Sequence, residues 1–260
     1  MSEDKLSLKN IIVAVNPAQK NHYALERALM MNKILEGGVN IHLFIAMEMD
    51  TLRADRDTFE FSCDGGWYNE LVKPMVDAGI DYTSEIIWTD SWHRSMVKSS
   101  EKNNADLIIM SDYATEKGHT ELTASKWALL RVSNCPVMIV HPSTSLNSET
   151  VLAAVNMQTD NPRYAELNEK ILSYSKLLAS RYGAEKHIVN GYADGMEYPD
   201  RAKLIRDTDT KQENIHLLQG GPRAIISEIA TKINADVVVI GTLARTGVMA
   251  AMRGNKSERI

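Results

Sequence analysis

The sequence has few of the residues that build covalent or metal-bound frameworks. Only two cysteines occur in 260 residues, Cys63 and Cys135, and they form neither a CxxC nor a CxxH pattern. The seven histidines are scattered, without an HxH or HxxxH pair. This distribution is typical of a reducing cytoplasm and predicts no bound metal.

Long apolar runs and clusters of one charge are also missing. No stretch approaches the roughly 18 apolar residues of a membrane span, and the start, MSEDKLSLKN, lacks the apolar core of a signal peptide. The net charge of −5 provides no general attraction to nucleic acid. We therefore expect a cytoplasmic protein without membrane or nucleic-acid partners.

What the chain does contain is an ordinary globular composition arranged as a repeat. It is 44% hydrophobic and 24% charged, and 260 residues suit one large domain or two smaller ones. Asn10–Asn16 (NIIVAVN) is a buried-type strand followed by apolar residues at helical spacing, and Thr150–Asn156 (TVLAAVN) begins the same pattern again. An Asn-Ala-Asp motif precedes an apolar run at 104–110 and again at 234–240. These repeats favour an internal duplication over a single doubly wound sheet.

Each half is predicted to form a mainly parallel five-stranded sheet with helices on both faces. We place the first domain at 1–143 and the second at 149–260, joined by the polar linker Pro142–Ser148. The second half ends inside the helix that should lead to its last strand, so we expect that strand to be missing. We also expect a turn at Gly65-Gly66, since no strand precedes this glycine pair.

The clearest sign of ligand binding lies near the C-terminus. The strand Asp236–Ile240 leads into a segment rich in glycine, and backbone N–H groups after such a strand hold phosphates in α/β proteins. The spacing Gly241-x2-Ala244-x9-Gly254-Asn255 resembles the nucleotide loop G-x2-G-x9-G-(S/T) of the universal stress protein family. Ala244 replaces the second glycine and Asn255 the final hydroxyl residue, while Arg245 adds a guanidinium that can pair with a phosphate.

The likeness extends over the whole chain, through the segments AVNMQTDNPRYAELNEKIL at 154–172 and TASKWALLRVSNCPVMIV at 123–140. The chain resembles a tandem universal stress protein of the bacterial E-type. This resemblance implies two tandem Rossmann-like (adenine nucleotide alpha hydrolase-like) domains that pair within the chain, with a homodimer left open, and a cytoplasmic role in stress survival. It does not decide the chemistry, because some members of the family hold ATP and others do not.

The resemblance also implies that the two halves differ at the nucleotide site. Members that hold ATP have an Asp at the end of the first strand, where this chain has Asn16 and Asn156. In the first half every glycine of the loop is replaced, as Ser111-x2-Ala114-x9-Ala124-Ser125, so side chains stand where backbone should meet phosphate. We therefore predict that only the second half binds an adenine nucleotide such as ATP, through Asn156, Gly241, Ala244, Arg245, Gly254 and Asn255.

Three hypotheses about function remain open. The first is a stress-response protein that binds an adenine nucleotide without fast turnover. The second is a nucleotide-independent module for a small ligand or a protein partner. An apolar pocket in the first half would fit this hypothesis, although its aromatic residues (Trp88, Trp92, Trp127, Phe59 and Phe61) are also typical of a core. The third is a weak ATPase. The absence of a GK(S/T) motif and of a water-activating carboxylate beside Gly241–Asn255 disfavours fast hydrolysis, and no catalytic residue is predicted.

Overall fold

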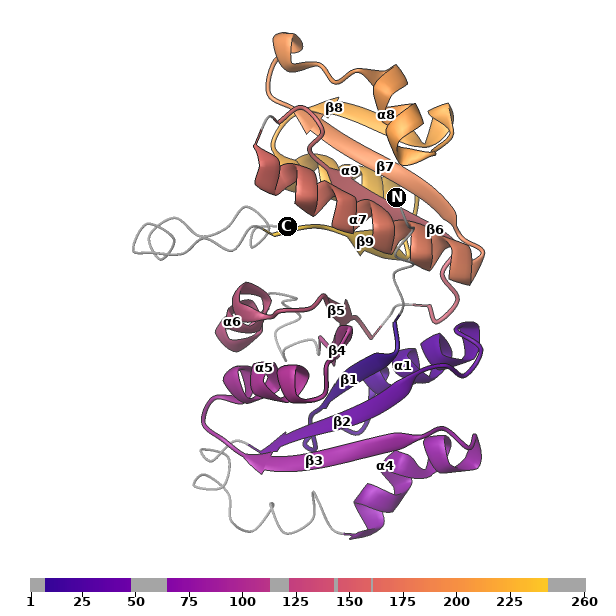
Figure 1. The fold of residues 1–260 in the computed structure, drawn as a ribbon, viewed down its shortest axis with the longest axis vertical. Helices are drawn as coiled ribbons and strands as arrows, with labels where there is room; N and C mark the ends of the chain where they lie inside the picture. The colour runs from indigo at the N-terminus through magenta and orange to yellow at the C-terminus, as the bar shows by residue number, and fades with distance from the viewer. Residues whose placement is uncertain (1–7, 48–64, 113–121, 143–144, 160, 243–260) are drawn as a thin grey trace. The chain divides into compact units, whose positions relative to one another are not determined.

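The structure is a computed structural model, and it describes residues 8–47, 65–112, 122–142, 145–159 and 161–242. These residues form two compact units, with the division between Leu146 and Asn147 (Figure 1). The division falls inside the predicted linker Pro142–Ser148, while the exact domain ends at 143 and 149 stay a prediction.

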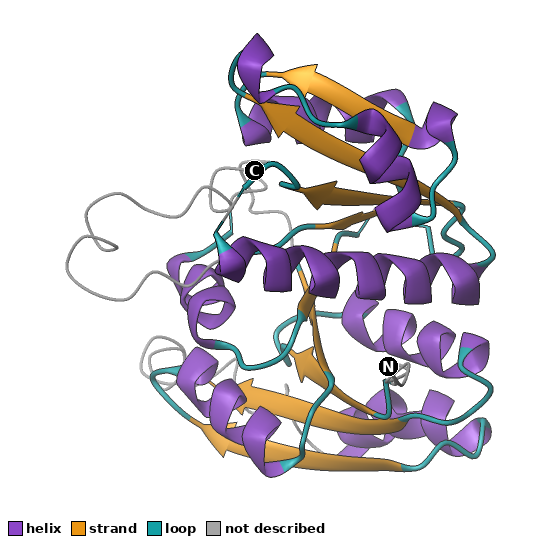
Figure 2. Ribbon diagram, turned by 45° about the horizontal axis from the view of Figure 1, so that its top comes forward, coloured by secondary structure: helices purple, strands orange, loops and turns teal. Residues whose placement is uncertain are grey.

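The first unit is a parallel sheet with helices on both faces (Figure 2). Its strand order is β3-β2-β1-β4-β5, and every pairing is parallel. The strands are β1 (Asn10–Val15), β2 (Asn40–Met47), β3 (Tyr82–Trp88), β4 (Leu107–Ser111) and β5 (Val137–Val140). The helices are α1 (Tyr23–Ile34), α4 (Gly65–Asp77), α5 (Trp92–Lys102) and α6 (Ala124–Val132). This architecture confirms the predicted five-stranded sheet.

One local prediction in this unit was wrong. The pair Gly65-Gly66 was expected to be a turn, but both residues belong to the first turn of α4. Glycine is a poor helix former by only about 1 kcal/mol relative to alanine. The buried face of the same helix, with Leu71, Val72 and Met75, supplies more stabilisation than the two glycines cost.

The second unit repeats this arrangement with the strand order β8-β7-β6-β9, again all parallel. The strands are β6 (Thr150–Val155), β7 (Glu185–Tyr192), β8 (Ile215–Gln219) and β9 (Val237–Val239). The helices are α7 (Pro162–Tyr182), α8 (Arg201–Thr208) and α9 (Pro222–Lys232), with 3₁₀ turns η1 (Gly195–Glu197) and η2 (Gln212–Asn214). The described part of this sheet has four strands rather than the five expected. The prediction about a final strand falls after Thr242, outside the described residues.

Both units use the same carboxylate clamp at the amino end of their central strands. Asp106 Oδ2 accepts the backbone N–H groups of Lys9 and Asn10 at 2.8 and 2.9 Å. Asp236 Oδ2 does the same with residues 149–150, at 2.8 and 3.0 Å. The repeated Asn-Ala-Asp motif therefore ties the fourth strand of each unit to the first.

The backbone conformation explains why the Asn-Ala-Asp motif begins with asparagine. Asn104 and Asn234 have φ angles of 47° and 49°, in the left-handed region that asparagine tolerates better than most residues. Each residue lies between the end of a helix, α5 or α9, and the following strand. The left-handed conformation reverses the chain there, so that the aspartate two residues later reaches the first strand.

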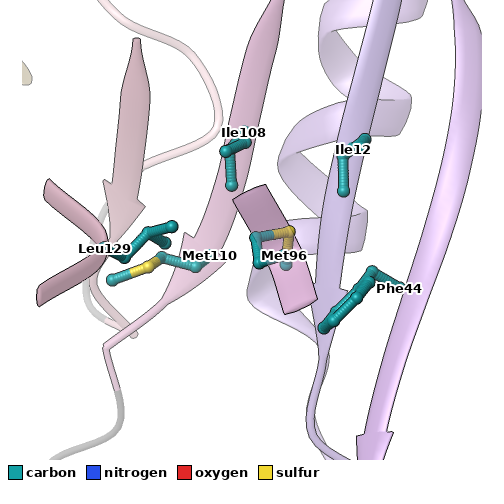
Figure 3. Close-up of a cluster of buried hydrophobic side chains, with 6 residues drawn as sticks. All are labelled: Ile12, Phe44, Met96, Ile108, Met110 and Leu129. Carbon is teal, nitrogen blue, oxygen red and sulfur yellow. The ribbon is translucent and has the colours of Figure 1, made fainter. Parts of the chain in front are cut away.

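The core of each unit lies between the sheet and the helices. In the first unit, one cluster packs α5 and α6 against the sheet (Figure 3), through Ile12, Phe44, Met96, Ile108, Met110 and Leu129. In the second unit, α7 and α8 cover one face through Ala153, Val155, Ile171, Ile188, Leu204 and Ile215, and α9 covers the other through Leu152, Val189, Ile225, Ile226 and Ile229. Central strands buried on both faces explain the uninterrupted apolar runs in the sequence.

A histidine pair links the edge strand β8 of the second sheet to its neighbour β7. His187 Nδ1 on β7 lies 3.1 Å from His216 Nε2 on β8, with ring planes within 11° of each other and centroids 5.4 Å apart. The centroid separation is close to the largest that this nitrogen–nitrogen distance allows, so the rings lie end to end and share an N–H···N hydrogen bond. One nitrogen donates and the other must accept, which requires one of the two rings to be neutral.

The surroundings of this pair disfavour protonation of His216. Burial lowers the pKa of His216 below its usual value, and the neighbouring His187, Lys232 and Arg201 lower it further. Acidic charge lies on the other side of the pair, because Glu185 Oε2 is 3.5 Å from His187 Nε2. Glu185 is itself 3.9 Å from the ammonium group of Lys211.

We expect the unfolding free energy of the second unit to fall as the pH drops below about 6.5, the ordinary histidine pKa. The unfolded chain binds a proton at His216 more readily than the folded chain. The stability that neutral His216 contributes is therefore fully present above this pH, and it is lost as the pH falls toward the lowered pKa of the folded state. Urea unfolding between about pH 8 and about pH 5 measures this slope. His216→Asn should flatten it, and an equally steep slope in that variant would contradict the assignment.

Candidate functional site

The site lies where the strand order of each sheet reverses. In the first unit this point is between β1 and β4, and in the second between β6 and β9. Open α/β sheets bind ligands in the crevice outside the carboxyl ends of their strands at such a point. Asn156 follows β6 directly and Gly241 closely follows β9, so both lie on this edge. The other predicted residues, Ala244, Arg245, Gly254 and Asn255, lie outside the described residues.

Asn156 is held in place by one side chain from α7. Its backbone N–H donates to Asn168 Oδ1 at 3.1 Å, and its carbonyl oxygen accepts from Asn168 Nδ2 at 2.7 Å. The Asn156 side chain is exposed, and its amide has no hydrogen-bond partner in the part of the chain that the structure describes. The clamp therefore fixes the backbone and leaves the side-chain donor and acceptor free.

The next residues are fixed by a second amide, which is fully buried. Asn190 Oδ1 at the end of β7 accepts the N–H of Met157 at 2.9 Å, and Asn190 Nδ2 donates to Gln158 Oε1 at 2.6 Å. Gln158 Nε2 donates to the carbonyl oxygens of Gly191 and Glu197, at 2.9 and 3.2 Å. This network ties the loop after β6 to the loop after β7. Burying such amides is tolerable because they are hydrogen-bonded.

The described residues of the first unit contain no equivalent of this network. The β1–β2 and β6–β7 registers put Ile45 where the second unit has Asn190. Asn16, the counterpart of Asn156, folds its side chain onto its own loop, where Oδ1 accepts the N–H of Ala18 at 3.0 Å. The acceptor of Asn16 is therefore already engaged. The same residue type at the same strand end has a free amide in only one of the two units.

The carboxyl end of β4 in the first unit is occupied by a buried ion pair. The side chain of Asp112 is 4% exposed, with Oδ1 2.5 Å from Lys126 Nζ and Oδ2 3.4 Å from His141 Nδ1. Its backbone N–H donates to the Val140 carbonyl oxygen at 2.8 Å. A carboxylate here repels an anion, and the ammonium group that could bind one is already paired. This arrangement supports the prediction that the first half has lost the phosphate site.

In the second unit the corresponding residue is Thr242, which carries no charge. The residue before it, Gly241, is required by packing. A Cβ at this position would lie 2.5 Å from Leu167 Cγ of α7, closer than side chains approach one another. The sequence suggested a glycine that admits a phosphate, whereas the structure reveals an independent need for close contact with α7.

The aromatic residues that the sequence suggested for an apolar pocket in the first half differ in how deeply they are buried. Trp92 packs against the core cluster of the first unit and Trp127 is half-buried, whereas Trp88 is 50% exposed. Phe59 and Phe61 lie outside the described residues. Within the described ranges, no three His, Cys, Asp or Glu side chains gather as metal ligands, and no helix is both long and apolar enough to cross a membrane.

These observations define an α/β protein made of two parallel sheets, each with a topological switch point where its strand order reverses. Residues 148–260 match the sequence model of the Universal stress protein family. Over 97% of its length, the chain is 26% identical to Universal stress protein E of Photorhabdus laumondii, covering 91% of that protein.

Two solved structures share the fold. A functionally unknown protein from Pseudomonas aeruginosa PAO1 superposes with a TM-score of 0.81 at 23% identity, with 99% of this chain and 90% of that chain covered. A universal stress protein from Archaeoglobus fulgidus superposes with a TM-score of 0.68 at 21% identity, covering 98% and 92%. Residues 148–260 belong to the universal stress protein family, and the similarity to Universal stress protein E over nearly the whole chain supports the tandem-domain organisation of the E-type. Membership in this family supports a role in the stress response.

The contact between Gly241 and α7 leads to a stability prediction. Gly241→Ala should lower the unfolding free energy by about 1–3 kcal/mol, the usual cost of an overpacked site. The loss should be much smaller in a Leu167→Ala background, because the clashing side chain is then absent.

Chemical denaturation of the four proteins of this cycle measures the coupling. Gly195→Ala is the matched control, since a Cβ there meets nothing within 4 Å. An equal cost of Gly241→Ala in both backgrounds would show that Leu167 is not the reason for the glycine.

Proposed function

We propose that the chain is a cytoplasmic stress-response protein whose second unit binds an adenine nucleotide at the edge formed by β6 and β9, without fast hydrolysis. The observation that carries this proposal is the difference between the two units at equivalent positions. The second unit has a free amide at Asn156 and an uncharged residue at Thr242, whereas the first has an engaged Asn16 and the buried carboxylate of Asp112.

The free amide of Asn156 suits a nucleobase. An asparagine side chain offers one donor and one acceptor, the pair that recognises N7 and the N6 amino group of adenine. Guanine has two acceptors on the same edge and would leave half of the amide unpaired. Because Asn168 holds both backbone groups of Asn156, little ordering is left for the ligand to induce.

The phosphate part of the proposal rests on the sequence after Thr242. Arg245, Gly254 and Asn255 belong to the loop whose spacing resembles the family pattern, and a guanidinium pairs well with a phosphate. A helix or loop that presents free N–H groups at this edge is the usual partner of such an anion. The position next to β9 has no carboxylate to oppose it, in contrast to Asp112 after β4.

The groups that the described residues place at this edge support the proposal of slow or absent hydrolysis. Phosphoryl transfer needs a positioned water and groups that stabilise the developing charge. In the described hydrogen-bond network around Gln158, the residue with a carboxylate is Glu197. Its Oε2 accepts the backbone N–H of Ala193 at 3.3 Å. We therefore propose a binding protein, and phosphate release from ATP above the rate in buffer would contradict this part.

Calorimetric titration with ATP tests the site through a matched pair of variants. Asn156→Leu should weaken binding about tenfold or more, as expected when a two-point contact to a base is lost. Asn16→Leu, the same change at the corresponding strand end of the first unit, should leave ATP affinity unchanged. GTP should bind more weakly than ATP to the unaltered protein, and this preference should disappear in Asn156→Leu.

Two results would overturn the proposal. One is the absence of any heat with ATP at concentrations well above those of the cell. The other is equal affinity for ATP in the unaltered protein and in Asn156→Leu. Arg245→Gln tests the phosphate contact separately, since it should weaken ATP more than adenosine.

A further inference from the structure

A cluster of polar side chains lies on β2 and β3 of the first unit, away from the edge where β1 and β4 end. In the β2–β3 register His42 stands directly opposite Thr83, and Glu85 follows two residues later on the same face of β3. Ser99 of α5 reaches this cluster from the helix layer, where its Oγ donates to Glu85 Oε1. Strand register therefore brings together a hydroxyl, an imidazole and a carboxylate.

The imidazole of His42 is in hydrogen-bond contact with the hydroxyl of Thr83. His42 Nδ1 lies 2.7 Å from Thr83 Oγ1. His42 is only 9% exposed, whereas Thr83 is an exposed residue of the edge strand. A nucleophile and its general base need this arrangement, with about 2.6–3.2 Å between their heavy atoms and the nucleophile open to a substrate.

The other ring nitrogen of His42 supports a chemical role. His42 Nε2 is buried and forms no aligned hydrogen bond with a described residue, although Glu85 Oε1 lies 3.3 Å from it. A carboxylate at this distance favours the tautomer with the proton on Nε2, so that Nδ1 accepts and the Thr83 hydroxyl donates. When Nδ1 takes up the hydroxyl proton, the ring becomes positively charged and pairs with Glu85. A buried nitrogen that lacks a good partner at rest and gains one during a reaction is expected of a general base.

The backbone of β3 offers a donor for the negative charge that develops in acyl transfer. β3 is the edge strand of its sheet, so alternate N–H groups of this strand point away from β2. Thr89 N–H donates to the Met47 carbonyl oxygen at 3.0 Å, on the side of β2. The continuous register puts the N–H of Thr83 on that side as well, so the N–H of Ser84 points outward. A backbone N–H directly after the nucleophile is a known donor to such an oxyanion.

We propose that Thr83 is a nucleophile that accepts an acyl group from an activated ester, with His42 as its general base. Thr83 Oγ1 forms a bond to the acyl carbon, and the bond from this carbon to the leaving oxygen breaks. The hydroxyl proton moves to His42 Nδ1 and from there to the leaving oxygen, while Glu85 acts as a positioning residue. All the participating groups belong to the first unit, so this proposal is independent of nucleotide binding in the second unit.

Incubation of the full-length protein with p-nitrophenyl acetate tests the proposal. Release of p-nitrophenolate is followed by absorbance, and peptide mass spectrometry locates the acetyl group, which should be found on Thr83. Thr83→Val has nearly the same shape and lies at an exposed position, so it should fold and lose this adduct. Thr83→Ser keeps a hydroxyl and should still be acetylated at this position.

His42→Gln tests the general base. It should slow acetylation of residue 83 about a hundredfold, the usual contribution of a positioned base, without removing the hydroxyl. Because His42 is buried, circular dichroism and urea unfolding verify that the variant is folded.

Ser84→Ala is the matched control. Ser84 is the next hydroxyl on the same exposed strand, but its Oγ lies 2.6 Å from Tyr68 Oη rather than beside an imidazole. This variant should leave the acetylation of Thr83 unchanged. The proposal would be overturned by acetyl groups on lysines with none on Thr83, by equal acetylation of Thr83 in folded His42→Gln and the unaltered protein, or by an equal loss in Ser84→Ala and His42→Gln.

Discussion

The fold of each unit depends on one interaction, the carboxylate of Asp106 or Asp236 that accepts two consecutive N–H groups at the start of the first strand. A central strand of a parallel sheet is buried on both faces, and the N–H groups at its start have no partner in the ladder. The aspartate satisfies them and joins the fourth strand to the first at the same time. This junction is where the strand order reverses, so the clamp at the amino end determines which loops meet at the carboxyl end.

The two copies of the framework differ in charge at the carboxyl end of the fourth strand, where one has a buried ion pair and the other an uncharged residue. At the carboxyl end of β4, the carboxylate of Asp112 is buried and lies within ion-pair distance of Lys126 and His141. At the carboxyl end of β9 the corresponding residue is Thr242, which carries no charge, and the loop after β6 is fixed by the amides of Asn168 and Asn190. The two copies therefore share one backbone framework but differ in the polar groups at this edge.

The sequence predicted most elements of the fold because their signals are local. The strands β1 and β6 lie within the predicted segments Asn10–Asn16 and Thr150–Asn156, and the apolar runs after the two Asn-Ala-Asp motifs form β4 and β9. The candidate site was predicted only in part. Spacing identified Gly241, but its contact with Leu167 depends on how α7 lies across β9, which no local pattern reveals. Asn168 and Asn190 gave a weak signal, as polar residues in otherwise apolar patterns, and their partners are set by strand register.

The sequence by itself determined the duplication, the order of strands and helices, and the half that carries the glycine-bearing loop, because each follows from periodicity and repeats along the chain. Only the tertiary structure decided which polar groups remain free. Asn16 and Asn156 are the same residue after equivalent strands, yet one is bound to its own loop and the other is held only through its backbone. The physical reason is that a hydrogen-bond partner is chosen by spatial neighbours, and Asn168 reaches Asn156 only after α7 has packed onto the sheet.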